Sequence, residues 1–130
     1  MPSRYVIDTE RRLVLSVGWD RVTCAEVLAH RDQLRSDPNF NPEFNQLADG
    51  TAVTALDISM DEAKKIASSS PFSPTSRRAF VASSLVVLGM ARMMETYSRI
   101  GKDREQVRVF HDRKAALEWL GLEDDFRSIP

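Results

Sequence analysis

Apolar and polar residues alternate near the start of the chain, and this pattern predicts a β-hairpin. Tyr5–Asp8 and Leu13–Val17 each mix apolar with polar positions, and charged residues 10–12 separate them. A period of two is typical of a strand that buries one face. We expect the first strand to be half exposed at an edge of the sheet, and residues 18–21 to break the second.

Helix start signals follow at four places. Thr23 and Ser59 each precede a glutamate by three residues, which is the spacing of a capping box. Ser83 and Ser84, and later Asp112, offer side-chain oxygens to the free N–H groups of two further helices.

Short apolar strands are expected before the last three helices. They lie at Phe44–Ala48, Ala79–Ala82 and Val107–Phe110, and a polar loop is expected over Asp49–Ile58. Ala79–Ala82 carries no charge, which is typical of a strand covered on both faces. The helix after it is apolar on almost every side through Met94, so it must also be covered nearly all round.

Two glycines bear on this apolar helix. Gly89 lies inside it, where glycine lowers helix stability by about 1 kcal/mol relative to alanine. A close approach of another part of the backbone would explain why a glycine stands there, so we predict such an approach. Gly101 is placed to end the helix as its C-cap.

The order of elements predicts a single α/β domain. Two strands and a helix precede three strand–helix pairs (β-β-α-β-α-β-α-β-α), an alternation that gives a mostly parallel sheet with right-handed crossovers and helices on its faces. We expect five strands, with the first strand antiparallel at an edge. The domain takes in residues 1–130, with its core over about 4–122 and a loosely held C-terminal tail.

Composition and charge exclude several function classes. The net charge is −1 and 42% of the residues are hydrophobic, so no field favours nucleic acid or an anionic membrane. No apolar run is long enough for a membrane span, and the first residues do not resemble a signal peptide. The single cysteine fits a reducing cytoplasm, and no Cys or His cluster suggests a metal or a cofactor.

Six segments, taken in order and spacing, carry a family resemblance. They are Asp37-Pro38-x-Phe40-x-Pro42-x-Phe44, Ser70-Pro71-Phe72, Arg78-Ala79-Phe80-Val81, Gly89-Met90-Ala91-Arg92-Met93, Val109-Phe110-x-Asp112 and Ala116-Leu117-Glu118-Trp119-Leu120. The chain resembles the SpoIIAA-like fold of STAS domains (anti-sigma-factor antagonists and transporter tails). More narrowly, it is similar to small bacterial SpoIIAA-like proteins of mostly unassigned function.

The resemblance implies a regulatory or protein-interaction module. In anti-sigma-factor antagonists, a serine at the start of the helix after the third strand is phosphorylated to switch partner binding. That motif has two adjacent serines followed by glycine. The corresponding region here is Asp49–Ser59, where only Ser59 lies near the helix start.

Candidate site residues lie beyond the carboxyl ends of the strands, where open parallel sheets bind ligands. The candidates for partner binding or a phospho-switch are Asp49, Thr51, Thr54, Asp57 and Ser59. The other carboxyl-edge candidates are Trp19, Ser83, Ser84 and His111.

Simpler structural interpretations stand beside these roles. Ser59 is a capping residue, the threonines are loop hydroxyls, and the aspartates are solvated turn carboxylates. A hydrolytic triad of Ser83 or Ser84 with His111 and Asp112 can also be considered. The Gly-x-Ser-x-Gly motif that exposes such a serine is absent, and Asp112 adjoins His111 in sequence, a geometry that does not favour orientation of the imidazole by the carboxylate. Cys24 is either a small buried hydrophobe or a thiol with a lowered pKa.

An apolar patch lies on the apolar helix that follows Ser84. Packing in the core and self-association are two alternative roles for this patch. Its members are Met90, Met93, Met94 and Tyr97. As a self-association surface it predicts a homo-oligomer, most simply a homodimer.

Three function classes follow. We favour a non-catalytic cytoplasmic module that binds a protein partner through its carboxyl-edge loops. The alternative is a small-molecule or lipid-binding protein related to CRAL-TRIO carriers, which requires a deep apolar pocket, although a chain of this length leaves little room for an acyl cavity. An enzyme, the third class, requires convergent titratable groups in a cleft.

Overall fold

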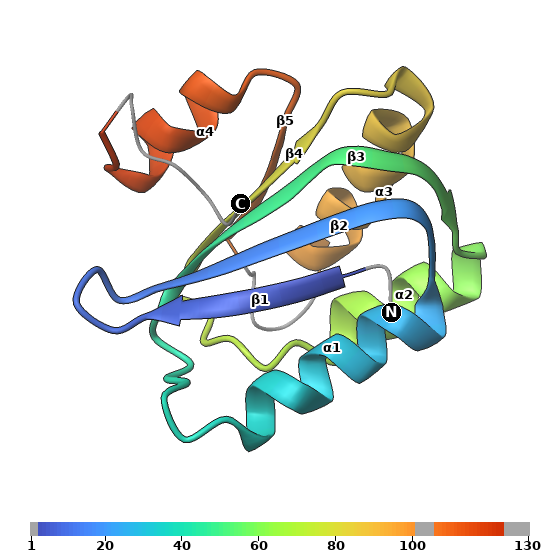
Figure 1. Ribbon diagram of the computed structural model, residues 1–130. Helices are drawn as coiled ribbons and strands as arrows, with labels where there is room; N and C mark the ends of the chain where they lie inside the picture. Colours follow the sequence, from blue (N-terminus) through green and yellow to red (C-terminus); the bar gives the residue numbers. More distant parts are fainter. Residues whose placement is uncertain (1–2, 101–105, 124–130) are drawn as a thin grey trace.

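The computed structural model describes residues 3–100 and 106–123, and it confirms the predicted order of elements (Figure 1). The elements are β1 (Ser3–Asp8), β2 (Leu13–Thr23), α1 (Cys24–Ser36), β3 (Asn45–Asp57), α2 (Met60–Ser68), β4 (Arg77–Ala82), α3 (Leu85–Ile100), β5 (Gln106–Phe110) and α4 (Arg113–Leu120).

The sheet has the order β1-β2-β3-β4-β5, in which β1 is antiparallel to β2 and the other neighbours are parallel. β4 lies between β3 and β5, and its Ala79 and Val81 are each 1% exposed. The predictions of an antiparallel edge strand and of an interior strand at residues 79–82 are therefore confirmed.

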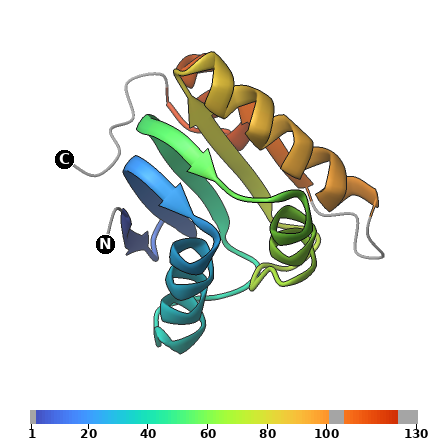
Figure 2. The same ribbon diagram turned by 90° about the vertical axis from the view of Figure 1, so that its right-hand side faces the viewer.

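Three helices cover one face of the sheet and α4 covers the other (Figures 1 and 2). Strands β2 to β5 follow one another across the sheet in chain order, so right-handed crossovers place α1, α2 and α3 on one face. α4 follows the last strand, and its Ala116 and Leu117 pack with Leu47 and Ala79 on the opposite face.

Both predicted capping boxes are present. The Glu26 N–H donates to Thr23 Oγ1 (3.4 Å), and the Thr23 N–H donates to Glu26 Oε1 (3.1 Å). Ser59 and Glu62 make the same pair of bonds at 3.1 and 2.9 Å. Because each box satisfies two otherwise free N–H groups, α1 and α2 begin where the sequence predicts.

The last two helices also begin at their predicted caps. The Leu88 N–H donates to the Ser84 carbonyl oxygen (2.9 Å), which closes the first turn of α3. Asp112 Oδ1 accepts from the Lys114 N–H (3.0 Å) at the start of α4. Gly121 ends α4 with φ +74°, a left-handed conformation that favours glycine.

β2 and β3 are longer than predicted, and the predicted polar loop over Asp49–Ile58 is wrong. Residues 19–23 and the second half of β3 pair with each other in parallel, with two register shifts. Val22 and Val53 from this region are 9% and 3% exposed, so core contacts hold it in the sheet. β4 pairs with β3 only as far as Gly50, so β2 and β3 extend beyond the end of β4.

The predicted close backbone approach at Gly89 is also wrong. A Cβ atom at Gly89 meets nothing within 4 Å, because that position of α3 is exposed. A close approach occurs instead at Gly50, where a Cβ atom would lie 2.8 Å from Phe80 Cε2 and 2.9 Å from the Val81 carbonyl oxygen. The predicted C-cap Gly101 and the C-terminal tail beyond residue 123 lie outside the described residues.

Candidate binding pocket

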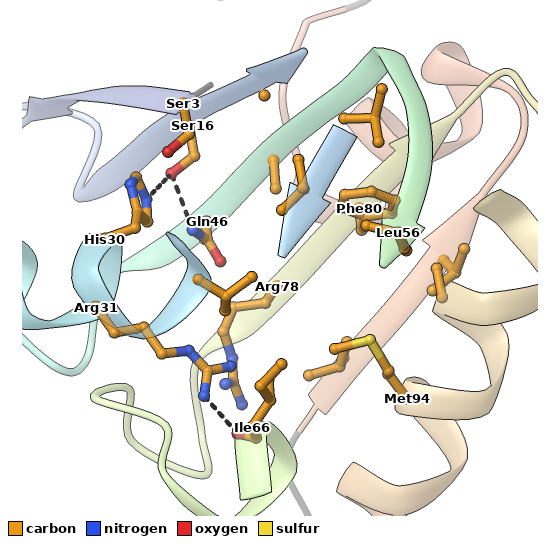
Figure 3. Close-up of a pocket in the computed structure, with 18 of the residues that line it drawn as sticks. Ser3, Ser16, His30, Arg31, Gln46, Leu56, Ile66, Arg78, Phe80 and Met94 are labelled. Atoms are coloured by element: carbon orange, nitrogen blue, oxygen red, sulfur yellow. Dashed lines mark hydrogen bonds between the residues drawn. The ribbon is translucent and has the colours of Figure 1, made fainter. Parts of the chain in front are cut away.

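A cavity of about 230 Å³ lies between the sheet and the layer of α1, α2 and α3 (Figure 3). Most of the side chains around it are apolar, and they come from the strands and from all three helices. Examples are Val22, Val27, Leu56, Ile66, Phe80 and Met94.

Short side chains on the sheet leave this space open. The strand pairing places Ser16, Ala48, Phe80 and Val109 in one row across the sheet, on the face that the three helices cover. Ser16 and Ala48 carry the smallest side chains of the row. The helices pack against larger side chains of the sheet, which hold them away from Ser16 and Ala48. The volume above these two residues is therefore not filled.

Polar groups converge at one end of the cavity. Ser16 Oγ lies 3.1 Å from His30 Nε2 and accepts a hydrogen bond from Gln46 Nε2 at 3.0 Å. β2, α1 and β3 supply one residue each. In Figure 3, the side-chain oxygen of Gln46 points away from Ser16 and into the cavity.

Burial keeps His30 neutral near pH 7. The surrounding protein lowers the pKa of its imidazole, mainly by desolvation and also through the nearby positive charge of Arg31. The ring of Tyr5 meets the imidazole edge to face, with centroids 5.3 Å apart. His30 Nδ1 is buried and has no hydrogen-bond partner among the described residues.

Two arginines border the other side of the cavity. Arg78 is 4% exposed, donates to Ser70 Oγ (2.7 Å), and stacks its guanidinium over the Phe72 ring at 5.2 Å. Arg31 donates to the Ile66 carbonyl oxygen near the end of α2. Backbone carbonyls at a helix C-terminus carry partial negative charge, which favours the Arg31 cation there.

Several predicted carboxyl-edge residues do lie together. Thr51 Oγ1 donates to Asp49 Oδ1 (2.7 Å), and Ser83 Oγ donates to the Thr51 carbonyl oxygen (2.6 Å). His111 Nδ1 lies 3.0 Å from the Ala82 carbonyl oxygen on the neighbouring strand. We call Asp49, Thr51, Ser83 and His111 the edge cluster; of these, only Asp49 also lines the cavity.

Other predicted residues lie apart from the edge cluster. Asp57, at the far end of β3, forms an exposed ion pair with Arg21, and Thr54 is exposed on the same strand. Ser59 caps α2, and Trp19 is half-buried in the extended part of β2.

The apolar patch on α3 faces α2. Met93, Met94 and Tyr97 are partly buried against the cluster that contains Ile58 and Ile66, so most of the patch contributes to packing between the two helices. Met90 is half-buried.

Cys24 belongs to the core as a small buried side chain. It is 5% exposed. Desolvation raises the pKa of its thiol, with the neighbouring Glu62 as a second cause, so the hypothesis of a lowered pKa is wrong.

The sequence prediction missed the polar end of the pocket. A local signal existed at Ser16, the one polar residue in the apolar run Leu13–Val17. Gln46 and Arg78 occupy the equivalent face of β3 and β4, where they are direct neighbours in the strand register. Their convergence with His30 depends on strand pairing, which the linear pattern does not reveal.

Within residues 3–100 and 106–123, no three His, Cys, Asp or Glu side chains gather in a way that would hold a metal ion. No helix in these two ranges has the length and apolar character needed to cross a membrane.

Comparison with known proteins gives the fold. No protein-family model and no curated protein matches the chain. A crystal structure of an uncharacterized DUF3478-family protein from Shewanella loihica, described as having a SpoIIAA-like fold, matches over 91% of this chain and 93% of that chain. The TM-score is 0.58 and the sequence identity is 17%, a likeness that shows fold alone. The chain therefore has the SpoIIAA-like fold that its sequence resemblance implies.

Proposed function

We propose that this domain is a non-catalytic binding protein for a small, mostly apolar molecule. The cavity carries the proposal, because apolar side chains surround it while a few polar groups converge at one end. This combination is typical of small-molecule sites. It favours the ligand-binding alternative over a module whose space beneath the strands is filled.

The cavity volume limits the size of the ligand. An apolar cavity of about 150 Å³ holds benzene. By the same ratio, a cavity of about 230 Å³ holds roughly nine non-hydrogen atoms. A long acyl chain exceeds this size, so the proposed ligand is a small molecule and not a membrane lipid.

The groups that a hydrolase would need are engaged in structural contacts. Ser83 donates to the Thr51 carbonyl oxygen, and His111 contacts the Ala82 carbonyl oxygen. Asp112 accepts from a backbone N–H at the start of α4. These contacts support a function without catalysis.

A second candidate is a cytoplasmic regulatory module that binds a protein partner or a second copy of itself. Leu85 and Val86, the first two residues of α3, are 76% and 73% exposed. Only Ser84 separates them from the edge cluster residue Ser83. Exposed apolar side chains grouped at one rim favour protein contact there.

Native mass spectrometry of the freshly purified protein tests both candidates. Ligand binding predicts an added small-molecule mass, retained after purification or acquired on incubation with octan-1-ol. Ala48→Leu, whose longer side chain fills the cavity, is expected to abolish it. Self-association predicts a dimer that Leu85→Ser dissociates. A monomer that takes up no added mass under either condition contradicts both ligand binding and self-association.

A further inference from the structure

The polar end of the cavity has a defined pattern of hydrogen-bond donors and acceptors. Ser16 is 7% exposed and lines the cavity, so a ligand there meets its hydroxyl away from bulk water. Ser16 Oγ is already in contact with His30 Nε2 (3.1 Å) and Gln46 Nε2 (3.0 Å). The positions of the protons on these three groups decide what they offer to a ligand.

The position of the His30 proton follows from its surroundings. His30 Nδ1 is buried and lacks a partner among the described residues. Among buried backbone groups, an N–H without an acceptor is rarer than an acceptor without a donor, and we expect the same preference for an imidazole nitrogen. The proton therefore belongs on Nε2, which donates to Ser16 Oγ. Ser16 then accepts two hydrogen bonds, and its own O–H is available to donate.

Gln46 provides the matching acceptor. Its Nε2 donates to Ser16, and this bond fixes the orientation of the planar amide. The amide oxygen consequently points into the cavity (Figure 3), and none of the described residues donates a hydrogen bond to it. The polar end of the cavity thus presents a donor, Ser16 O–H, and an acceptor, Gln46 Oε1. The Ser3 hydroxyl also lines the cavity, is buried, and has no hydrogen-bond partner among the described residues.

We propose that the pocket selects a neutral molecule whose polar group both donates and accepts a hydrogen bond, as a hydroxyl does, on an apolar body. The inference rests on the proposed ligand-binding function and adds the chemical class of the ligand. The ligand hydroxyl donates to Gln46 Oε1 and accepts from Ser16 Oγ. Its apolar body lies among side chains such as Val27 and Phe80.

The charges around the cavity do not favour an anionic ligand. The charged side chains that line it are three acidic and two basic ones: Glu26, Asp49, Glu95, Arg31 and Arg78. Arg31 donates to the Ile66 carbonyl oxygen near the C-terminus of α2, whose partial negative charge offsets part of the charge of the guanidinium, and Arg78 donates to Ser70 Oγ. A carboxylate would therefore lose its hydration without gaining a positively charged site built for it.

Three probes of similar size separate these chemistries. Octan-1-ol donates and accepts, its isomer heptyl methyl ether only accepts, and octanoate is an anion. We expect NMR titrations at pH 7.5 to give an affinity for octan-1-ol about five- to tenfold above that for the ether, which corresponds to one net hydrogen bond. Octanoate is expected to bind more weakly than octan-1-ol.

Variants assign the two hydrogen bonds. Gln46→Met removes the acceptor while keeping the side-chain length. It should lower the affinity for octan-1-ol about five- to tenfold and leave the affinity for the ether unchanged. Ser16→Ala removes the donor and should lower the affinity for both octan-1-ol and the ether. Thermal unfolding of each variant confirms that it is folded.

The outcomes distinguish this inference from the proposed function. Equal affinities for alcohol and ether, unaffected by Gln46→Met, overturn the inference and leave ligand binding intact. Tightest binding of octanoate, lost in Arg78→Met, also overturns it in favour of an anion. If none of the three probes binds, the inference and the proposed function both fail.

Discussion

The two faces of the sheet bury their side chains in different ways. On the α4 face, Leu15, Leu47 and Ala79 stand side by side and are 7%, 0% and 1% exposed. On the face of the three crossover helices, the next row places Ser16 beside Ala48, and a cavity of about 230 Å³ remains above them. One sheet therefore has a filled face and a face with space for a ligand.

The short strand β4 contributes side chains to both faces of the sheet. In β4, Ala79 and Val81 belong to the core with α4, whereas Arg78 and Phe80 point to the cavity. Successive residues of a strand point to opposite faces, so the two sets do not compete for space. We expect substitutions on the α4 face to change stability and substitutions on the cavity face to change binding.

The largest effect is expected for Leu47→Ala. Leu47 is 0% exposed in the filled face, so truncation should lower the free energy of unfolding by about 3 kcal/mol. Urea denaturation measures this loss. Leu56→Ala, on the half-buried wall of the cavity, is the control and should cost clearly less. An equal or larger loss at Leu56 would contradict the contrast between the faces.

A matched pair of glycine substitutions tests the packing of β3 on β4. Gly50→Ala should cost about 1–3 kcal/mol, because the new methyl group would overlap the Phe80 ring and the Val81 carbonyl oxygen. Gly89→Ala meets no atom within 4 Å and should stabilise α3 by up to about 1 kcal/mol. Thermal unfolding of both variants gives the comparison, and effects of the same sign would disprove it.

The pH dependence of stability should come partly from the cavity face. Burial lowers the pKa of His30 in the folded state, so the unfolded chain binds more protons as the pH falls below the ordinary histidine pKa. Stability should then decrease from pH 7 to the folded pKa of His30, by at most about 1.4 kcal/mol per pH unit for one group. Arg31, beside the imidazole, acts in the same direction.

His30→Gln removes this titration and can still bond to Ser16. Urea denaturation between pH 7.5 and 5.5 should therefore give a flatter profile for the variant than for the native chain. A variant with an unchanged slope would show that other groups cause the decrease.

The smallest effect on stability is expected for Ala48→Leu. The added side chain enters existing space, so the free energy of unfolding should change by less than about 1 kcal/mol. Binding of octan-1-ol should nevertheless disappear in an NMR titration. Retained binding together with unchanged stability would mean that the probe occupies another site.

The helix starts and the interior strand could be predicted because their signals are local. Thr23 with Glu26 and Ser59 with Glu62 satisfy backbone N–H groups within one turn, whatever the rest of the fold does. Ala79–Ala82 is an uncharged run between turn signals, which is typical of a strand covered on both faces.

The extension of β2 and β3 could not be predicted in the same way. Thr51 and Thr54 suggested a loop, but the parallel pairing between β2 and β3 supplies backbone partners from far along the chain. Such pairing overrides the local polar character, because each strand satisfies the hydrogen-bonding groups of the other.

The pocket was missed for a related reason. Ser16, His30 and Gln46 are each unremarkable in the linear sequence, and only the register of β2 with β3 and the position of α1 bring them together. The space itself depends on the small side chain of Ala48 next to Ser16. A volume that is left unfilled has no sequence motif.

The alternation along β2, β3 and β4 also bears on how this domain can evolve. Under the proposed function, substitutions at Ser16, Gln46 or Phe80 would alter recognition while their immediate neighbours in the chain keep the architecture. Related domains can consequently diverge in specificity without a new backbone. For the same reason, a mutant library confined to these positions is a direct route to altered ligand preference.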